Sequence, residues 1–339
     1  MLPDPRRYVP DSSNPLVARA SGSHAELVAV LRERAAAGRD DEIRAALAGA
    51  PSAAQYARLW RALCAAVEKP ADDEVSTRVF AMPWIIVCAG ASDATLSCVL
   101  PDPAAITRVL EQHGVFGASR SVGSSNVLCA LELLEALAPG ELLRGWESPK
   151  IRQAAPASIQ LTRAGEEVHL RFLLGAAVVP AHAPDIVETA ANIGAWGTHA
   201  LRAMGTQLAA PGVQVLAIPR PPAGLYSAAY AGRRAVVETA FNLFMSNTLR
   251  RVRLVLGDPQ VTLSAHAGGE LRVTLWTTLD DTMVEGFRWP LHPADDIEEI
   301  ERVIGDMISE CRLQPPNVIA RILPDHSPTG AVLFPATFE

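Results

Sequence analysis

The chain has 339 residues, 49% of them hydrophobic, and a formal net charge of -7 at neutral pH. Its mean hydropathy is +0.15, yet charged residues interrupt every apolar run before about 18 residues, the length that a membrane-spanning helix needs. We therefore expect no membrane span. We also expect no nucleic acid as the main partner, because phosphate neutralisation needs a clustered cationic surface.

The five cysteines suggest a reducing compartment. They are odd in number, scattered and embedded in apolar sequence, and none has a Cys-x-x-Cys spacing, so we interpret them as buried thiols. The N-terminus has two arginines but no following apolar segment, so a secretory signal is not expected. Only Lys69 and Lys150 among the 30 basic residues are lysine, which favours a GC-rich bacterial genome. We therefore expect a cytoplasmic bacterial protein.

The N-terminal part of the chain predicts an arm followed by helices. Residues 1–22 are rich in Pro, Ser and Asn with almost no apolar periodicity, which predicts an extended or disordered arm. Residues 23–70 contain three amphipathic patterns that begin at Ser23, Asp40 and Ser52, residue types that cap helices. These patterns predict a small N-terminal helical layer.

Residues 75–218 form the first predicted α/β unit. The most apolar segment of the chain predicts a buried strand from Trp84 to Ala89, after Pro83. A second strand is expected from Thr95 to Leu100, and Pro103 is placed to begin a helix.

The rest of this unit predicts a hairpin, a helix and a strand. Residues 159–162 and 168–174 alternate around Gly165, which is typical of a hairpin. A long Gly- and Ala-rich helix is expected from Ile186 to Leu208, followed by a strand from Val213 to Ile218.

One segment of this unit, residues 117–126, suggests an anion site. It is the only Gly/Ser-rich loop that precedes a strong helical pattern, from Val127 to Leu137. Backbone N–H groups and hydroxyls at a helix N-terminus favour an anion, and Arg120 would supply countercharge. The segment has neither the lysine nor the glycine spacing of a phosphate-binding loop, so a flexible loop with a capping residue is the alternative. The candidate residues are Ser119, Arg120, Ser124, Ser125 and Asn126.

Residues 225–339 form the second predicted unit, after a proline-rich stretch at 219–224 that is the best candidate for a linker. Residues 251–290 alternate between apolar and polar types and stop at three turn signals, which predicts an antiparallel meander of four short strands. Amphipathic helices are expected before the meander, over residues 236–248, and after it, over residues 297–311.

The two units suggest a repeat. Both have the order helix, hairpin, helix, strand, and the hairpin sequences SIQLTRAGEEVHLRF and QVTLSAHAGGELRVTL resemble each other. Our hypothesis is that the chain contains two divergent copies of one unit, offset by roughly a hundred residues. Different strand orders in the two sheets would contradict it.

Two oppositely charged regions suggest a protein partner. The acidic residues at 295–299 have a structural interpretation, because negative charge stabilises a helix N-terminus and Asp295 can cap it. The alternative is that complementary patches steer association with another protein or a second copy. The basic candidates are Arg233, Arg234, Arg250, Arg251 and Arg253, and the acidic candidates are Asp295, Asp296, Glu298 and Glu299.

No catalytic or cofactor motif is recognisable, and no paired His/Cys spacing predicts a metal site. The sets His182 with Asp185, and Asp325 with His326 and Ser327, have residue types found in acid-base sites, but adjacent prolines favour surface turns. We therefore predict no catalytic residues, no metal and no cofactor.

These observations favour an α/β protein of the α+β type, with mixed or antiparallel sheets covered by helices. Two functions remain open. The first is a non-enzymatic protein-interaction or assembly subunit that forms a homo-oligomer or a complex with another protein. The second is an enzyme or sensor that binds a small anionic, phosphorylated ligand at residues 117–126.

Overall fold

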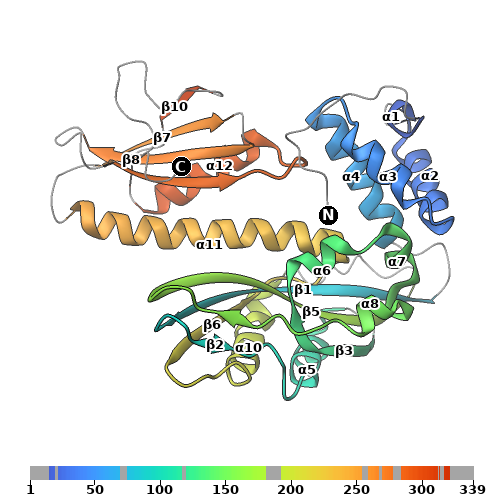
Figure 1. Cartoon of the computed structure of the whole chain (residues 1–339), viewed down its shortest axis with the longest axis horizontal. Helices are drawn as coiled ribbons and strands as arrows, with labels where there is room; N and C mark the ends of the chain where they lie inside the picture. The colour runs from blue at the N-terminus through green and yellow to red at the C-terminus, as the bar shows by residue number, and fades with distance from the viewer. Residues whose placement is uncertain are drawn as a thin grey trace. The chain divides into compact units, whose positions relative to one another are not determined.

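The structure is a computed structural model of the whole chain (Figure 1). It describes residues 15–19, 22–68, 75–116, 120–180, 192–253, 259–266, 269–277, 284–311, 313 and 317–320. The fold is α+β, with helices and largely antiparallel sheets, as the sequence predicted.

The chain divides into two compact units. Unit 1 contains Pro10–Pro51 and Arg58–Val236, and unit 2 contains Ser52–Ala57 and Val237–Glu339. One boundary falls inside helix α4 (Ala53–Glu68), after Ala57, and another inside helix α11 (Leu225–Arg253), after Val236. The boundary in α11 lies C-terminal to the proline-rich stretch at 219–224.

The predicted N-terminal helices are confirmed. They are α2 (His24–Ala36), α3 (Asp40–Ala48) and α4 (Ala53–Glu68). The arm was predicted incompletely, because Pro15–Arg19 forms a short helix, α1, in which Leu16 and Val17 are buried. Proline is favoured in the first turn of a helix, and the burial of Leu16 and Val17 stabilises this one. Residues 1–14 lie outside the described part of the chain.

Unit 1 is built on a four-stranded antiparallel sheet with the order β3-β5-β1-β6. Its two central strands pair over 16 residues each, from Val75↔Pro180 to Gly90↔Gly165. The strands are β1 (Val75–Gly90), β3 (Arg120–Cys129), β5 (Gly165–Pro180) and β6 (Val213–Pro219). The central strand β1 is thus longer than predicted and runs through Pro83.

Pro83 is tolerated inside β1 because the neighbouring strand β6 ends beside it. Strand β6 ends at Pro219, which pairs with Trp84, and the carbonyl of Pro83 accepts a hydrogen bond from the Arg220 N–H at 2.8 Å. The proline-rich stretch then continues along β1 to the bridge between Ala81 and Ala223. This stretch is an ordered extension of the sheet edge.

Each face of this sheet has its own cover. On one face, Trp84 and Ile86 of β1 share a core with Ile106 of α5 and with Trp196 and Met204 of α10. On the other, the backbone of α11 comes close enough at Gly232 that an added Cβ would lie 3.0 Å from Leu170 Cδ1 and Phe172 Cζ. The remaining elements of unit 1 are β2 (Thr95–Leu96), α5 (Ala104–Gln112), α6 (Leu131–Ala136), α7 (Pro139–Arg144), η1 (Gly145–Glu147), α8 (Pro149–Arg152), β4 (Ile159–Gln160) and α10 (Ile193–Gly205).

Unit 2 contains the predicted meander between two helices. Strands β7 (Pro259–His266), β8 (Glu270–Thr277) and β9 (Val284–Pro290) pair antiparallel, and β10 (Asn317–Ala320) pairs parallel with β7. Helix α12 (Ile297–Glu310) and the C-terminal half of α11 cover one face of this sheet. The core residues are Phe241, Met245, Leu249, Val261, Leu263, Leu271, Val273, Leu275, Trp289, Ile300, Ile304 and Ile308.

Two details of the prediction are wrong. Within the described residues the meander has three strands rather than four, because Arg251–Arg253, the start of the first predicted strand, continue α11. Strands β4 and β5 do not form a hairpin, since β4 pairs with β2 while β5 pairs with β1 and β3.

The repeat hypothesis is also wrong. In chain order, the strands of unit 1 are arranged second, third, first, fourth, and those of unit 2 fourth, first, second, third. Unit 2 contains a parallel pair, whereas every pair in the unit 1 sheet is antiparallel. The two hairpin-like sequences resemble each other because both are short alternating strand segments.

Among the helices that the structure describes, none combines the length and the apolar character needed to cross a membrane.

Candidate functional site

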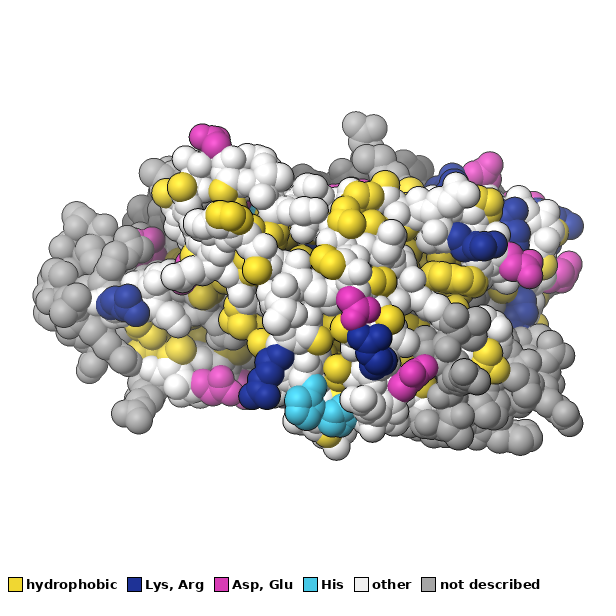
Figure 2. Space-filling model, turned by 90° about the horizontal axis from the view of Figure 1, so that it is seen from below, with side chains coloured by type: hydrophobic (Ala, Val, Ile, Leu, Met, Phe, Trp, Pro, Cys, Tyr) yellow, Lys and Arg dark blue, Asp and Glu magenta, His cyan; other side chains and the backbone are white. Residues whose placement is uncertain are grey.

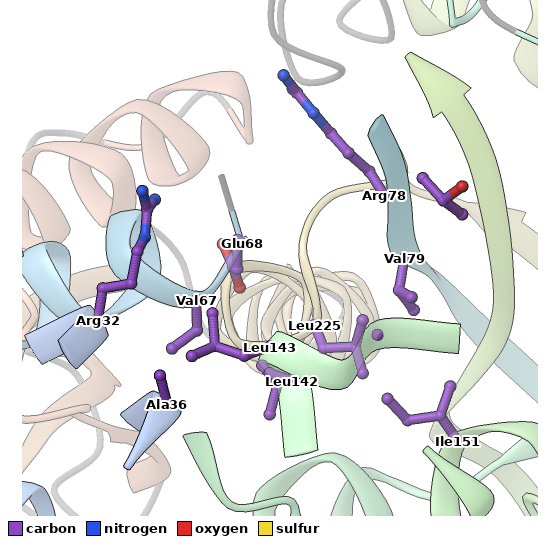
Figure 3. Close-up of a pocket in the computed structure, with 12 residues that line it drawn as sticks. Arg32, Ala36, Val67, Glu68, Arg78, Val79, Leu142, Leu143, Ile151 and Leu225 are labelled. Carbon is purple, nitrogen blue, oxygen red and sulfur yellow. The ribbon is translucent and has the colours of Figure 1, made fainter. Parts of the chain in front are cut away.

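Unit 1 contains a pocket of about 340 Å³ (Figure 3). Its wall is mostly apolar, and three charged side chains, Arg32, Glu68 and Arg78, stand around it. Figure 3 shows Arg32 on one side and Arg78 on the other, with Glu68 between them and Leu142, Leu143 and Leu225 below. The lining comes from α2, α4, β1, α7, η1, α8 and α11. The apolar lining residues are Ala36, Val67, Val79, Leu142, Leu143, Ile151 and Leu225.

Arg32 is fixed by the end of a neighbouring helix. Its Nε donates a hydrogen bond to the carbonyl of Ala66 at 2.9 Å, and its Nη2 approaches the carbonyl of Ala65 at 3.5 Å. Both carbonyls lie in the last turn of α4, where helical carbonyls have no intrahelical partner. Arg32 therefore joins α2 to α4 and brings positive charge to the negative end of the α4 dipole.

Glu68 is fixed by the beginning of another helix. Its Oε1 accepts a hydrogen bond from the Ser227 N–H at 2.8 Å, and its Oε2 accepts one from the Ser227 hydroxyl at 2.5 Å. Glycine at position 224 permits this approach, because a Cβ there would lie 2.6 Å from Glu68 Cγ. The carboxylate thus caps the N-terminus of α11, where negative charge is favourable.

Arg78 differs from the other two charged residues. Its Nε atom is buried, and it has no hydrogen-bond partner among the residues that the structure describes. A buried guanidinium nitrogen without an acceptor costs free energy, because it has lost its hydration. An anionic group in the pocket would supply the acceptor, and a carboxylate or phosphate matches the geometry of a guanidinium.

The pocket therefore has the features of a small-molecule site. Its volume lies near the lower end of the range of about 300–1,000 Å³ that is typical of such sites, and few polar groups interrupt an apolar wall. The arrangement suits a ligand with an apolar body and one anionic group.

The anion site predicted at residues 117–126 rests on an incorrect local structure. Residues 120–129 form strand β3, and the next helix begins only at Leu131. Val127, Leu128 and Cys129 are buried in the sheet, and a short apolar run does not distinguish a strand from a helix. The helix N-terminus that was to bind the anion is therefore not at this place.

The hydroxyls and carbonyls of this strand are used within the fold. The Ser125 hydroxyl donates to the carbonyl of Val127 at 2.7 Å, and the Ser124 hydroxyl accepts from the Thr107 hydroxyl at 3.2 Å. The carbonyl of Asn126 accepts from the Leu100 N–H at 2.8 Å. Arg120 is the first residue of β3, and Ser119 lies outside the described residues.

The predicted basic region is divided between the two units. Arg233 and Arg234 belong to the part of α11 in unit 1, where Arg233 forms an ion pair with Glu135. Arg250 is exposed on the part of α11 in unit 2, and Arg251 and Arg253 follow it in the same helix. The sequence placed these arginines at the two ends of one predicted helix, and in the structure Arg234 and Arg250 lie more than four turns apart along α11.

The structure confirms that an acidic residue of the region 295–299 caps helix α12, but one position later than predicted. Asp296, rather than Asp295, caps α12, accepting from the N–H groups of Glu298 at 3.0 Å and Glu299 at 3.5 Å. Asp295 instead accepts from the N–H of His292 at 2.6 Å, which closes the turn before the helix. Glu298 and Glu299 are exposed.

A second polar cluster lies on β5 and is structural. Glu167 accepts hydrogen bonds from the N–H groups of Thr162 at 2.8 Å and Arg163 at 2.9 Å, and these bonds hold its pKa below the ordinary value. Burial, followed by the charge of Arg171, lowers the pKa of His169, whose Nε2 lies 3.3 Å from Glu167. Arg171 donates to the carbonyls of Ala157 at 2.6 Å and Ser158 at 3.0 Å. Together these residues fasten the segment before β5 to that strand.

The five cysteines are free. Burial raises the pKa of Cys88 to about 11 and that of Cys129 to about 12, so both are protonated thiols near neutral pH. Within the described residues, no three His, Cys, Asp or Glu side chains are grouped to hold a metal ion. The segments that contain His182, Asp185, Asp325, His326 and Ser327 lie outside those residues.

Sequence reasoning missed the pocket. Its lining comes from seven elements between residues 32 and 225, and Arg32 and Arg78 are isolated arginines with no motif around them. The one local signal was Arg78, the only charged residue of the strand segment 75–90. No protein-family model, curated protein or solved structure matches this chain.

Proposed function

We propose that this protein binds a small organic anion with an apolar body in the pocket of unit 1 and acts as a ligand sensor. The proposal keeps the class of ligand inferred from the sequence and moves the site from residues 117–126 to the pocket. The observation that supports it is the buried Nε of Arg78 beside an apolar wall. Arg32 and Glu68 already have partners in the fold, so Arg78 is the anchor for the anionic group.

The test compares ligands that differ only in charge or only in the apolar body. Isothermal titration calorimetry would measure octanoate, octyl phosphate and indole-3-acetate, together with octanol, which lacks the charge, and acetate, which lacks the body. We expect at least one of the three large anions to bind ten times more tightly than octanol and acetate, since a hydrogen bond to a charged group contributes about 1.5–3 kcal/mol.

Two variants test whether the anion binds at Arg78. Arg78→Gln should remove the preference for the anion over the alcohol, while Arg302→Gln, which changes an exposed arginine of α12, should leave it unchanged. Equal binding of octanoate and octanol, or an unchanged preference in Arg78→Gln, would contradict the proposal.

A second proposal is the interaction function, in which the chain forms a homo-oligomer or joins another protein. The observation that favours it is the charge on unit 2, where α12 exposes Glu298 and Glu299 and α11 exposes Arg250. Complementary charges steer association and weaken as salt rises. Sedimentation velocity should then show an assembly larger than a monomer, which dissociates in high salt and in a Glu298→Lys, Glu299→Lys variant. A monomer at every concentration would contradict self-association.

We further propose a cytoplasmic location. The five free cysteines support it, because cysteines in oxidising compartments are usually paired in disulfides, whereas cytosolic thiols stay reduced. Fractionation of the producing cells would test the location, and recovery in the extracellular or periplasmic fraction would contradict it.

A further inference from the structure

Two histidines from distant parts of the chain meet on the surface of unit 1. His113 follows the last residue of α5, and His199 lies in α10, 86 residues away. Both side chains are exposed, and Figure 2 shows histidine side chains in contact at the surface on the side from which it is viewed. This pair has no residue in common with the pocket lined by Arg32 and Arg78.

The backbone holds both residues in place. The N–H of His113 bonds to the carbonyl of Val109 at 3.1 Å, and the chain then turns at Gly114, whose φ of +60° is strained for other residues. Helices α5 and α10 share one core, to which Ile106, Leu110, Trp196, Ala200 and Met204 contribute. The two imidazoles therefore project from a rigid pair of helices.

The rings face each other through nitrogen atoms. His113 Nε2 lies 2.8 Å from His199 Nδ1, and the ring centroids are 4.9 Å apart with planes inclined by 30°. The centroid separation is close to the N–N distance plus two ring radii, so the rings meet edge to edge rather than face over face. The in-plane lone pair of one nitrogen and the N–H of the other point into the same gap.

We propose that this pair binds a divalent transition-metal ion such as Zn²⁺, with water as the remaining ligands. Neutral imidazole nitrogens are ordinary ligands of Zn²⁺, Cu²⁺ and Ni²⁺. Zn–N bonds of about 2.0–2.1 Å at a tetrahedral angle place two nitrogens about 3.3 Å apart. The two nitrogens thus need to separate by about half an ångström and the rings to turn until both lone pairs point at the ion, which exposed side chains allow.

Binding of the metal ion to the neutral histidine pair releases no net proton. Each coordinating nitrogen must present a lone pair, so the hydrogen between the rings leaves the gap and the same ring takes one up at its other nitrogen by exchange with water. The neutral pair then binds the ion without net loss of a proton. The site also lies at the C-terminus of α5, where the helix dipole favours positive charge.

The experiment uses the full chain and Zn²⁺. Calorimetric titration would compare the wild type with His113→Asn, His199→Asn and the double variant, and with His24→Asn, which changes an exposed histidine of α2. We expect each single variant to lose at least tenfold in affinity for one zinc ion, and the double variant to lose no more than the singles, because chelation needs both rings. His24→Asn should bind as the wild type does.

A second measurement separates chelation from misfolding. Circular dichroism without metal should be the same for all variants, and Zn²⁺ should raise the unfolding temperature of the wild type and of His24→Asn above that of the other variants. The cysteines are present in every variant, so zinc bound by thiols contributes equally. Equal zinc affinity in the wild type and the double variant would overturn the proposal, as would losses in the two single variants that simply add.

Discussion

Phe80 and Gly175 are cross-strand partners in the central pair of the unit 1 sheet. The ring of Phe80 crosses the glycine so closely that an added Cβ would lie 2.9 Å from both Cε1 and Cε2. Phe80 is buried and also packs against Phe116, with the ring centroids 4.9 Å apart, so it has little freedom to move away.

Gly175→Ala should therefore destabilise the protein by about 1–3 kcal/mol, the usual cost of overpacking a core. The matched control is Gly205→Ala, because position 205 ends α10 and its Cβ would meet nothing within 4 Å. That change should be neutral or stabilising, since alanine favours a helix over glycine. Urea denaturation measures both, and equal stabilities of the two variants would contradict the packing of Phe80.

Asp296 caps α12 through the hydrogen bonds described above. Asp296→Ala should lower the free energy of unfolding by about 0.5–2 kcal/mol, whereas Asp296→Asn should have little effect, because asparagine caps equally well. Denaturant titration of the three proteins tests this. A large loss in Asp296→Asn would show that the charge, rather than the cap, matters.

The helix-sheet core of unit 2 centres on Phe241 of α11. Its ring centroid lies 5.2 Å from that of Phe287 and 5.8 Å from that of Trp289, both in edge-to-face orientation. Phe241→Ala should destabilise unit 2 by about 3–5 kcal/mol. Asn242→Ala, at the next and exposed position of the same helix, should stay within about 0.5 kcal/mol of the wild type in denaturant titration. Similar stabilities of the two variants would contradict this packing.

At the scale of elements, the sequence predicted those helices and strands whose type follows from a single hydrophobic periodicity. The amphipathic patterns of α4, of the C-terminal half of α11 and of α12, and the alternation in β7 and β8, have one apolar face each, so their types followed from spacing. Strand β3 was predicted as loop and helix because its pairing depends on the distant β5, with register shifts at Ser121 and Ser124. The hairpin prediction for β4 and β5 failed because each strand pairs with a partner remote in sequence.

At the scale of the molecule, the polar cluster on β5 predicts sensitivity to acid. The folded state lowers the pKa of His169 below 6.5 and that of Glu167 below 4.5. The unfolded chain therefore takes up protons first, and the stability that these groups contribute is lost as the pH falls, for His169 below 6.5 and for Glu167 below 4.5.

His169→Gln should flatten the decline in the free energy of unfolding between pH 6.5 and 4.5, while leaving the decline at lower pH. His24→Gln, at an exposed position, should retain the wild-type profile. Denaturant titrations across this range measure the difference. A stability that rises as the pH falls would contradict the assignment.

Neither candidate site could be predicted from the sequence. The pocket gathers residues from seven elements, and the histidine pair joins positions 86 residues apart. Both depend on how helices pack on the unit 1 sheet, and the register and order of that sheet arise from long-range pairing. The segment 117–126 suggested an anionic ligand, whereas both proposed sites rest on the packing of the fold.

The most direct test of the account is methyl NMR of the full chain during titration with the tightest-binding anion of the calorimetric series. The account predicts shifts confined to methyl groups around the pocket, with the largest at Val79, Leu142 and Leu225, and their disappearance in Arg78→Gln. Shifts concentrated in unit 2 methyls such as those of Leu263 and Val273, or shifts of the same size in Arg78→Gln, would contradict it.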